Sequence, residues 1–559
     1  ERRLGRPNFV SCIYNMPLRQ ITSRQFGHWM FRAPGNILLE QAVHPLSQIV
    51  ALAGKIENFV TVAGEPIEIS PGVPFYPSAT LTLKGSVLPA ELRFAVGQDF
   101  PFWQISVVCD DGVATADMLN NRFFTQERGR WLGAYDTFLS GARTGFGILG
   151  ESLRAAVDFS LATVKLKPRN DSFYQSVKSS IAAFHKALDD GRTPELNGEF
   201  GAHLVSICEE AARTAFTAPF SPARVQDEGD YDVAVLGGTG FIGSHVVKLL
   251  LSKGQRVGVM ARNVANLPAE FFQPGVVVKS GDIGKPADVE RAIGNAKVVI
   301  NLAHGGGGAT YEQIRNAMVG GAEIVARACL ARGVRRLVHV GSIASLYLGS
   351  ENSVITGDTP PDPASELRAE YARAKAECDR MLLAMHKSEG LPVCILRPGL
   401  VVGEGGTPVH SGLGFFNNDQ HCIGWNTGRN PLPFVLVDDV AAAAWHACNA
   451  PNAVGRAYNI VGDVRLSARE YVAELSKALS RPLHFHPQQP SLLWLEETAK
   501  WTVKRVTGRK GPRPTYRDLL SRGLRAKFDC EDAKKDLGWQ PEATREKFVE
   551  HGIRVFAKA

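Results

Sequence analysis

The sequence lacks the features that assign many proteins to a class at first sight. No apolar run approaches the roughly 20 residues of a membrane-spanning helix, and no secretory signal is visible at the N-terminus. The nine cysteines form no C-x-x-C pair and no Cys/His cluster at zinc spacing. We therefore expect no metal site and no stable insertion into a membrane, and the dispersed thiols favour the cytoplasm.

Signals of nucleic-acid binding are missing as well. The chain has no zinc finger, no basic-region helix and no platform of aromatic residues for single strands. Its net charge of +7 is mild and suits anionic small molecules as well as nucleic acid. We expect a small-molecule substrate and no nucleic-acid partner.

The chain is long enough for more than one domain. Its 559 residues exceed one compact core. Residues 217–230, TAPFSPARVQDEGD, are polar, with two prolines and no apolar periodicity, which is typical of a linker. The sequence therefore predicts a first domain over residues 1–216 and a second over residues 231–559.

The first domain has the pattern of a half-buried sheet. Apolar and polar residues alternate in Ala79–Leu83, Leu92–Val96 and Gln104–Val108, between glycine and proline turns. This period of two predicts strands, and helical patterns lie at either end. We expect an α+β domain with a mostly antiparallel sheet.

The second domain alternates continuous apolar runs with helical patterns. Strands of a parallel sheet are buried on both faces, so their sequences are apolar without a break. The pattern predicts an α/β domain with a doubly wound parallel sheet. The expected strands are Tyr231–Leu236, Arg256–Met260, Val276–Lys279, Val298–Leu302, Arg336–Val340 and Val393–Leu396.

A glycine-rich turn, in VAVLGGTGFIG, joins the first of these strands to a helical pattern over Ile242–Lys253. The first glycine permits a tight bend, the second lets the backbone approach a pyrophosphate, and the third lets the helix pack against the strand. The helix N–H groups then point at the phosphates. The motif predicts a Rossmann-type dinucleotide site formed by Gly237, Thr239, Gly240, Phe241, Ile242 and Gly243.

The residues after the second and third strands bear on the choice of dinucleotide. About twenty residues beyond the glycine turn, NAD-selective sites place an acid that binds the ribose 2′-hydroxyl. This chain has Arg262 there and no acid beside it, and a guanidinium suits a 2′-phosphate. NADP is therefore favoured, and NAD stays open as the alternative. Asp282, after the third strand, is placed to accept a hydrogen bond from the adenine amine.

Three residues form a candidate catalytic group. Tyr371 and Lys375 are spaced i and i+4, on one face of a helix. A nearby ammonium stabilises a phenolate, which makes Tyr371 usable as an acid or base. Ser342 follows the strand Arg336–Val340, at the carboxyl edge where such sheets bind ligands. Its hydroxyl is expected to hold the substrate oxygen while Tyr371 moves the proton.

Together these motifs resemble the extended short-chain dehydrogenase/reductase superfamily of NAD(P)-dependent epimerases, dehydratases and reductases. The resemblance covers residues 231–559. It implies that Tyr371 is the acid/base, that Lys375 also binds the nicotinamide ribose, and that Ser342 polarises the substrate oxygen. It further implies cofactor contacts from Ile283, Ala303 and Pro398. The matching motifs are GGTGFIG at 237–243, GDI at 281–283, NLAH at 301–304, VGSIA at 340–344, YARAK at 371–375, RPG at 397–399, LVDDVA at 436–441 and the ending DAKKDLGW at 532–539.

Departures from the family pattern narrow the chemistry. Dehydratases of the superfamily carry an Asp-Glu pair after the catalytic hydroxyl residue, where this chain has Ile343 and Ala344, so dehydration is disfavoured. Gly341 replaces the first of the paired serines common in epimerases. Met318 stands where an asparagine is usual, which argues against a proton relay there. The glycine run Gly305–Gly308 suggests a mobile substrate loop, or else a plain flexible linker.

The segments expected to cover the substrate are 404–435 and 465–527. Within them, Trp494–Lys527 mixes aromatic with basic side chains, which suits a diphosphate-linked sugar. A solvated basic helix face explains the pattern equally well, and a peripheral membrane contact is a lesser alternative. The side chains concerned are Trp494, Trp501, Tyr516, Lys504, Arg505, Arg509, Lys510, Arg513 and Arg517.

The first domain resembles the C-terminal half of the glucose–fructose oxidoreductase / inositol dehydrogenase family. In that family an acid and a histidine four residues apart contact the substrate, and Glu40 and His44 match the spacing. The family's glycine loop and catalytic lysine belong to a preceding domain that this sequence does not contain. We expect either a longer natural protein, which would be a fusion of two activities, or a remnant domain that serves as an oligomerisation platform. The alternative to a catalytic His44 is a helix-buried histidine bonded to a neighbour.

The sequence as a whole predicts an NADP-preferring oxidoreductase. Its substrate is expected to be a hydroxyl or ketone of a sugar, linked to a nucleotide. Epimerisation by transient oxidation is the alternative chemistry. A redox sensor that binds the dinucleotide without turnover is the alternative of another class, although a sensor needs none of the three catalytic side chains. We also expect a homo-oligomer.

Overall fold

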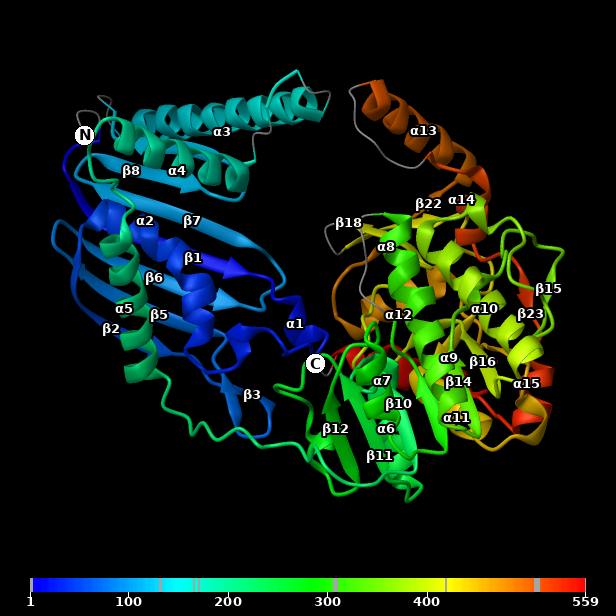
Figure 1. Cartoon of the computed structure of the whole chain (residues 1–559). Helices are drawn as coiled ribbons and strands as arrows, with labels where there is room; N and C mark the ends of the chain where they lie inside the picture. The colour runs from blue at the N-terminus through cyan, green and yellow to red at the C-terminus, as the bar shows by residue number, and fades with distance from the viewer. Residues whose placement is uncertain are drawn as a thin grey trace. The chain divides into compact units, whose positions relative to one another are not determined.

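The computed structural model describes the chain over residues 4–129, 133–163, 166–168, 171–304, 310–417, 420–506 and 513–557. The chain divides into two compact units between Ala223 and Arg224. In Figure 1 the first unit runs from blue to cyan-green and the second from green to red.

The first unit contains a seven-stranded sheet in the order β2-β5-β6-β1-β7-β8-β9. Only β1 and β6 pair in parallel, and the other neighbours are antiparallel. The predicted α+β fold with a mostly antiparallel sheet is therefore confirmed. The strands are β1 (Pro7–Met16), β2 (Ile56–Ala63), β5 (Ser78–Gly85), β6 (Pro89–Val96), β7 (Phe102–Cys109), β8 (Gly112–Asp117) and β9 (Arg122–Glu127), beside a small hairpin of β3 (Ile67–Ser70) and β4 (Val73–Phe75).

Helices cover one face of this sheet. The short α1 (Arg19–Thr22) follows β1, and α2 (Val43–Ala53) and α5 (Gly198–Ala215) pack their apolar sides on the sheet to form the core of the unit. Two further helices, α3 (Ala134–Thr163) and α4 (Ser172–Asp189), follow β9 in the chain (Figure 1).

Helix α3 packs along the edge strand β9. The Ser140 hydroxyl donates to the carbonyl of Glu127, and the Thr144 hydroxyl donates to the carbonyl of Thr125, both at 3.0 Å. An edge strand otherwise presents unpaired backbone groups to solvent. The two hydroxyls therefore satisfy carbonyls that have no neighbouring strand.

The second unit contains a seven-stranded parallel sheet in the order β12-β11-β10-β13-β14-β16-β21. The predicted doubly wound sheet is confirmed. All six expected strands are present, and their ends agree with the expected ones to within two residues. The strands are β10 (Val233–Leu236), β11 (Val257–Ala261), β12 (Val276–Ser280), β13 (Val298–Asn301), β14 (Arg336–Val340), β16 (Val393–Pro398) and β21 (Ala457–Ile460).

Helices cover both faces of the parallel sheet. Each face has its own apolar core, one beneath α6, α11, α12, α15 and α16, the other beneath α7, α9 and α10. The short α8 (Tyr311–Arg315) continues through a π-helical turn, Asn316–Gly320, into α9. The helix bounds are α6 (Phe241–Ser252), α7 (Pro286–Ile293), α9 (Gly321–Ala331), α10 (Glu370–Glu389), α11 (Val437–Ala447), α12 (Ala468–Ala478), α15 (Glu531–Leu537) and α16 (Arg545–Gly552).

The strand order fixes where a ligand can bind. From β10 the chain moves outward to β11 and β12, then returns to β13 on the other side of β10. In open α/β sheets, ligands bind at the carboxyl ends of the strands on either side of such a reversal. The crevice at the ends of β10 and β13 is therefore the expected place for the dinucleotide.

Smaller elements lie above the carboxyl edge. A three-stranded sheet joins β18 (Gly414–Asn417), β19 (His421–Trp425) and β22 (His484–Gln488), and two helices follow it, α13 (Pro490–Val506) and α14 (Tyr516–Arg522). Two pairs of short strands complete the unit, β15 (Val354–Ile355) with β23 (Lys527–Phe528), and β17 (Leu400–Val402) with β20 (Phe434–Leu436). Across the residues that the structure describes, no helix has the length and apolar character to cross a membrane.

The C-terminal segment docks on α11. Trp539 is fully buried, and its indole Nε1 donates to the carbonyl of Asp439 at 2.8 Å. The Asp439 carboxylate accepts the backbone N–H of Glu542 at 3.1 Å. Two sequence motifs a hundred residues apart, LVDDVA and DAKKDLGW, thus meet in the fold.

Replacing Asp439 by asparagine is expected to change how stability depends on pH. Burial raises the pKa of Asp439 to about 6, above the usual value of about 3.9. Because the folded state holds this proton more tightly than the unfolded chain, the free energy of unfolding falls as pH rises from about 4 to about 6. Asp439→Asn removes this pH dependence. From pH 4 to pH 7, the free energy of unfolding of the variant should therefore rise by about 2 kcal/mol relative to that of the unmodified chain. Urea unfolding at both pH values measures the difference, and equal changes in the two proteins would contradict the assignment.

Candidate active site

The glycine turn is shaped to hold a pyrophosphate. Gly237 has a φ of +81°, and a Cβ on it would lie 2.8 Å from the backbone nitrogen of Ala303. A Cβ on Gly243 would lie 2.3 Å from the carbonyl oxygen of Gly237, so helix and strand meet without room for a side chain. At Gly240 the nearest atom would be 3.4 Å away, and no side chain caps the N-terminus of α6. The first N–H groups of α6 are thus available to phosphate oxygens, as the motif requires.

The residues expected around the adenosine lie along the same edge. Arg262 follows β11 and is exposed, and Asp282 follows β12 and is exposed as well. One carboxylate oxygen of Asp282 accepts the Gly284 N–H at 2.9 Å, which leaves the other oxygen for an adenine amine. Ile283 is buried against the sheet core, and Pro398 is buried at the end of β16.

The structure gathers the three catalytic candidates at the carboxyl ends of the strands. Ser342 comes two residues after β14, and the 3₁₀ turn that follows it packs against α10. Tyr371 lies in the first turn of α10 and is 47% exposed. Lys375 lies one turn later, is 5% exposed, and has its Nζ 5.8 Å from the centre of the Tyr371 ring. The Ser342 Oγ accepts the Ala344 N–H at 3.2 Å, so its own proton is free for a substrate oxygen.

A buried polar chain beneath these residues was missed from the sequence. The Ala303 N–H donates to Asn301 Oδ1 at 3.1 Å, which orients the amide so that its Nδ2 donates to His339 Nδ1 at 3.3 Å. His339 Nε2 lies 3.6 Å from the Cys378 sulfur. Burial, aided by the charge of Lys375, lowers the pKa of His339 to about 3, so the imidazole is neutral. These contacts link the crevice between β10 and β13 to α10.

A buried ion pair ties α10 to β16. Arg397 Nε donates to Asp379 Oδ2 at 2.8 Å, and both side chains are at most 1% exposed. Arg397 also donates to the carbonyl of Thr359 at 3.0 Å. Asp379 lies one turn beyond Lys375, so the pair positions the helix that carries Tyr371 and Lys375.

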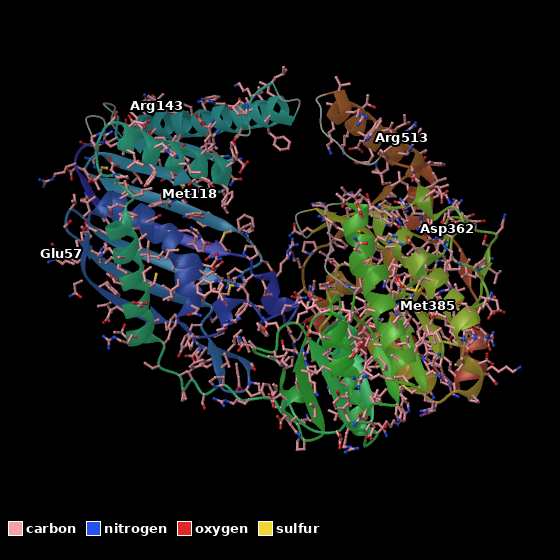
Figure 2. All side chains as sticks on the ribbon, in the orientation of Figure 1. Glu57, Met118, Arg143, Asp362, Met385 and Arg513 are labelled. Atoms are coloured by element: carbon pink, nitrogen blue, oxygen red, sulfur yellow. The ribbon has the colours of Figure 1, made fainter. Side chains whose placement is uncertain are left out.

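The segments expected to cover the substrate are more apolar than the sequence suggested, and more of their arginines pair with carboxylates of the protein. Arg517, predicted to bind a diphosphate, donates to Asp362 at 2.6 Å and lies over the Tyr347 ring at 3.8 Å. Arg368 pairs with Asp362 at 3.0 Å and with Asp518 at 3.2 Å. Burial opposes ionisation of Asp362, but the hydrogen bonds from Arg517 and Arg368 hold its pKa below the ordinary value. Figure 2 labels Asp362 and the exposed Arg513.

Aromatic side chains dominate the rest of this side. Trp425 packs with Leu493 and Leu519, and Trp494 joins them from the side. The Trp494 and Tyr516 rings are 6.1 Å apart. Of the basic residues predicted here, Arg509 and Lys510 lie outside the described residues, as do Gly305–Gly308. Met318 is buried in the apolar core beside α10.

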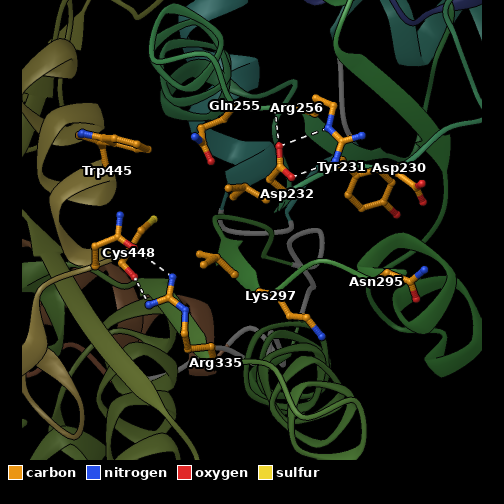
Figure 3. Close-up of a pocket in the computed structure, with 13 residues that line it drawn as sticks. Asp230, Tyr231, Asp232, Gln255, Arg256, Asn295, Lys297, Arg335, Trp445 and Cys448 are labelled. Atoms are coloured by element: carbon orange, nitrogen blue, oxygen red, sulfur yellow. Dashed lines mark hydrogen bonds and ion pairs between the residues drawn. The ribbon is translucent and has the colours of Figure 1, made fainter.

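A cavity of about 420 Å³ lies at the opposite edge of the sheet, where β10, β13 and β14 begin (Figure 3). Its arginines are already engaged. Arg335 donates to Asn449 at 2.9 Å, and Arg256 donates to Asp232 at 3.0 Å. Because parallel sheets of this kind bind ligands at the carboxyl ends of the strands, we assign this cavity no part in the site.

In the first unit, Glu40 lies in a π-helical turn, Leu38–Ala42, and His44 lies in the first turn of α2. His44 is exposed, so the expectation of a helix-buried histidine is wrong. The Tyr14 hydroxyl donates to Gln41 at 2.7 Å. Burial, with the charges of Cys12 and Glu40, raises the pKa of Tyr14 to about 12. The catalytic role of Glu40 and His44 stays a prediction.

Comparison with known families agrees with this geometry. The model of the NAD dependent epimerase/dehydratase family matches residues 233–461, from the start of β10 to just beyond β21. Residues 233–461 form a domain of that family. It is the domain of NAD(P)-dependent oxidoreductases and epimerases of the extended short-chain type, so the second unit is an enzyme with an NAD(P) cofactor. The resemblance noted for the first unit stays a prediction.

Several characterised relatives align with the second unit over most of their length. The 2-alkyl-3-oxoalkanoate reductase of Stenotrophomonas maltophilia (strain K279a) is 26% identical, over 58% of this chain and 97% of its own. The UDP-glucose 4-epimerase of Vibrio cholerae is 23% identical, over 58% and 96%. The 3 beta-hydroxysteroid dehydrogenase/Delta 5-->4-isomerase of Mycobacterium tuberculosis (strain ATCC 25618 / H37Rv) is 26% identical, over 55% and 86%. Among solved structures, gox2253 is 22% identical with a TM-score of 0.49, over 58% of this chain and 98% of that one.

Proposed function

We propose that the second unit is an NADP-preferring oxidoreductase that interconverts a secondary alcohol and a ketone. One observation carries the proposal. Ser342 follows the carboxyl end of β14, and Tyr371 and Lys375 lie in the first turns of α10, which packs against the turn after Ser342. The glycine turn of the same unit fits a pyrophosphate. A dinucleotide-binding sensor needs the turn but none of these three side chains, so turnover is the better account.

The chain's own residues then have distinct tasks. The bound nicotinamide supplies the acceptor or donor of two electrons. Ser342 donates its free hydroxyl proton to the substrate oxygen, and Tyr371 exchanges a proton with the same oxygen. Lys375 is buried one turn from Tyr371, so its ammonium stabilises the phenolate and is also placed to bind the nicotinamide ribose. The neutral His339 beneath Lys375 adds no competing positive charge.

For the substrate we propose a sugar, linked to a nucleotide, as the first class. The exposed Arg513 and the aromatic pair Trp494 and Tyr516 suit a diphosphate and a base or sugar ring. One observation favours a second class, an apolar ketone or sterol-like alcohol. Arg517 is already paired with Asp362, and the Trp425, Leu493 and Leu519 cluster beside it is apolar.

A substrate panel separates these classes. The full chain would be incubated with NADPH or NADP and either UDP-sugars and dTDP-sugars or alkyl ketones and sterols, and absorbance at the nicotinamide band would be followed. Turnover of sugar nucleotides supports the first class, and turnover of apolar ketones supports the second. Interconversion of two sugar nucleotides without net change in the dinucleotide would identify the epimerase alternative. No reaction with any of them would favour the sensor.

Replacing Arg262 by alanine is expected to weaken NADPH binding about tenfold or more and to leave NADH binding nearly unchanged, because a charge-assisted pair with the 2′-phosphate is lost. Fluorescence titration of both dinucleotides measures the two affinities. Arg256→Ala is the matched control, since Arg256 is exposed near the other end of the same strand and is paired with Asp232. Equal loss for both dinucleotides would overturn the NADP assignment.

Two further proposals concern the rest of the chain. The first unit is proposed to be related to the substrate half of the glucose–fructose oxidoreductase family, with Glu40 and His44 as its former or present substrate contacts. Glu40→Gln with His44→Ala should then leave turnover by the second unit unchanged. We also propose a reducing compartment, the cytoplasm, because all nine cysteines are free thiols and eight of them are buried.

A further inference from the structure

Helix α3 turns its polar face toward β9 and its apolar face away from the sheet of the first unit. Ser140 and Thr144 bond to β9, and Asp158 on the same side is 8% exposed. A helix at the surface of a globular unit ordinarily buries its apolar stripe and exposes its polar face. The reversed arrangement means that the apolar face of α3 serves something other than the core of its own unit.

Seven of the exposed apolar side chains of α3 form a stripe along the helix. They are between 44% and 77% exposed, and successive members are mostly three or four residues apart, or seven across two turns. Such spacing keeps side chains on one face and is typical of a seam between helices. The stripe consists of Tyr135, Phe138, Leu139, Phe146, Leu149, Leu153 and Val157.

Two glycines flank the stripe. A Cβ added at Gly145 or at Gly150 would meet no atom within 4 Å. A glycine inside a helix costs about 1 kcal/mol relative to alanine, and nothing within the unit requires one here. Close approach of another helix to this face would give both glycines a role.

Helix α4 carries a second stripe of the same kind. Its members are three or four residues apart and between 45% and 77% exposed. Ala187 is the one residue of α4 recorded as buried among those whose side chains are described. The stripe consists of Phe173, Val177, Ile181, Phe184 and Leu188.

We infer that α3 and α4 form an interface with a second copy of this chain. Together the two stripes expose twelve large apolar side chains, which is more than a monomer usually leaves uncovered. The five aromatic ones alone present on the order of 700 Å² of accessible surface, at about 200 Å² for a fully exposed ring. A stable interface of standard size covers about 800 Å² on each partner. The two stripes therefore supply the area that a dimer needs.

Charge favours a second copy over a lipid surface. The 30 residues of α3 hold two arginines and three carboxylates, a net charge of −1, and α4 holds two lysines and one aspartate, a net charge of +1. Helices that lie on anionic lipid are rich in Lys and Arg on their polar face. In a two-fold symmetric contact the stripes of one protomer can meet those of its partner, while the charged side chains of both helices lie outside the stripes.

The test measures the mass of the full chain in solution by sedimentation equilibrium. The stripe variant combines Leu153→Glu and Val177→Glu. The control combines Arg154→Glu and Lys178→Glu, one residue along each helix and outside both stripes. Figure 2 labels Arg143, which lies on α3. We expect a dimer for the unmodified chain and the control, and at least a tenfold weaker dimer for the stripe variant, because buried charges oppose association. Circular dichroism and turnover by the second unit should be the same in all three proteins.

Three outcomes would overturn the inference. The first is an unmodified chain that stays monomeric at all concentrations. The second is a stripe variant that dimerises as tightly as the control, which would place the interface elsewhere. The third is a monomer that co-sediments with vesicles of phosphatidylcholine and phosphatidylglycerol and loses this binding in the stripe variant, which would make a bilayer the occupant. Loss of turnover in every variant would concern the proposed function and not this interface.

Discussion

Replacing Tyr371 by phenylalanine is expected to lower kcat/KM by about 10² to 10⁴-fold, because a positioned acid or base contributes that much to a proton transfer. The ring is half exposed in the first turn of α10, so removing its hydroxyl should not disturb the fold. Affinity for the dinucleotide should stay the same, since the glycine turn and Lys375 are untouched. Steady-state kinetics on the substrate found in the panel, together with NADPH titration, measures both quantities.

Tyr516→Phe provides the matched control. Tyr516 is 44% exposed, close to the 47% of Tyr371, and it lies in α14 on the substrate side. Its loss should raise KM modestly and leave kcat nearly unchanged if it only contacts substrate. If Tyr371→Phe retained full activity, the mechanism proposed above would be wrong.

Replacing Asp379 by alanine is expected to lower the free energy of unfolding of the second unit by about 3–5 kcal/mol. The change leaves the Arg397 guanidinium buried without its carboxylate, in a place where both side chains are almost inaccessible to water. Exposed pairs behave differently. Arg327 and Glu323 are both more than 40% exposed, so Glu323→Ala should cost less than about 1 kcal/mol.

Calorimetry can assign the effect to the correct unit. The chain has two compact units, so two transitions are expected, and NADP should raise the transition of the unit that binds it. Asp379→Ala should lower that transition alone. A double variant, Asp379→Leu with Arg397→Met, removes both charges and should recover part of the loss, although the Thr359 carbonyl then lacks its donor. A single variant as stable as the control would show that the pair contributes little.

Much of the second unit could be predicted because its information is local. Each strand is a short apolar run, and the glycine turn follows β10 within a few residues. The strand β21 was missed because it has only four residues and Asn459, which is fully buried, breaks its apolar run. A buried polar residue in a short strand gives the same pattern as a turn.

The candidate site divides in the same way. Tyr371 and Lys375 are one turn apart, so their spacing alone indicates a shared face. Asn301, His339 and Cys378 come from two strands and a helix, and each taken singly is an ordinary residue in its element. Likewise the sequence showed Arg517 but not that Asp362, 155 residues earlier, is its partner. Only the fold shows which cations are left for a ligand.

The hydrogen bonds from Ser140 and Thr144 of α3 to β9 have a consequence for solubility. A sheet grows when another strand adds to a free edge, and this is the first step of many aggregation reactions. With α3 in place, the β9 edge cannot template such growth, and β2 at the other end of the sheet is the remaining edge among the described strands. Local unfolding of α3 would therefore expose β9 as a free edge strand, and the chain should aggregate before the rest of its fold is lost.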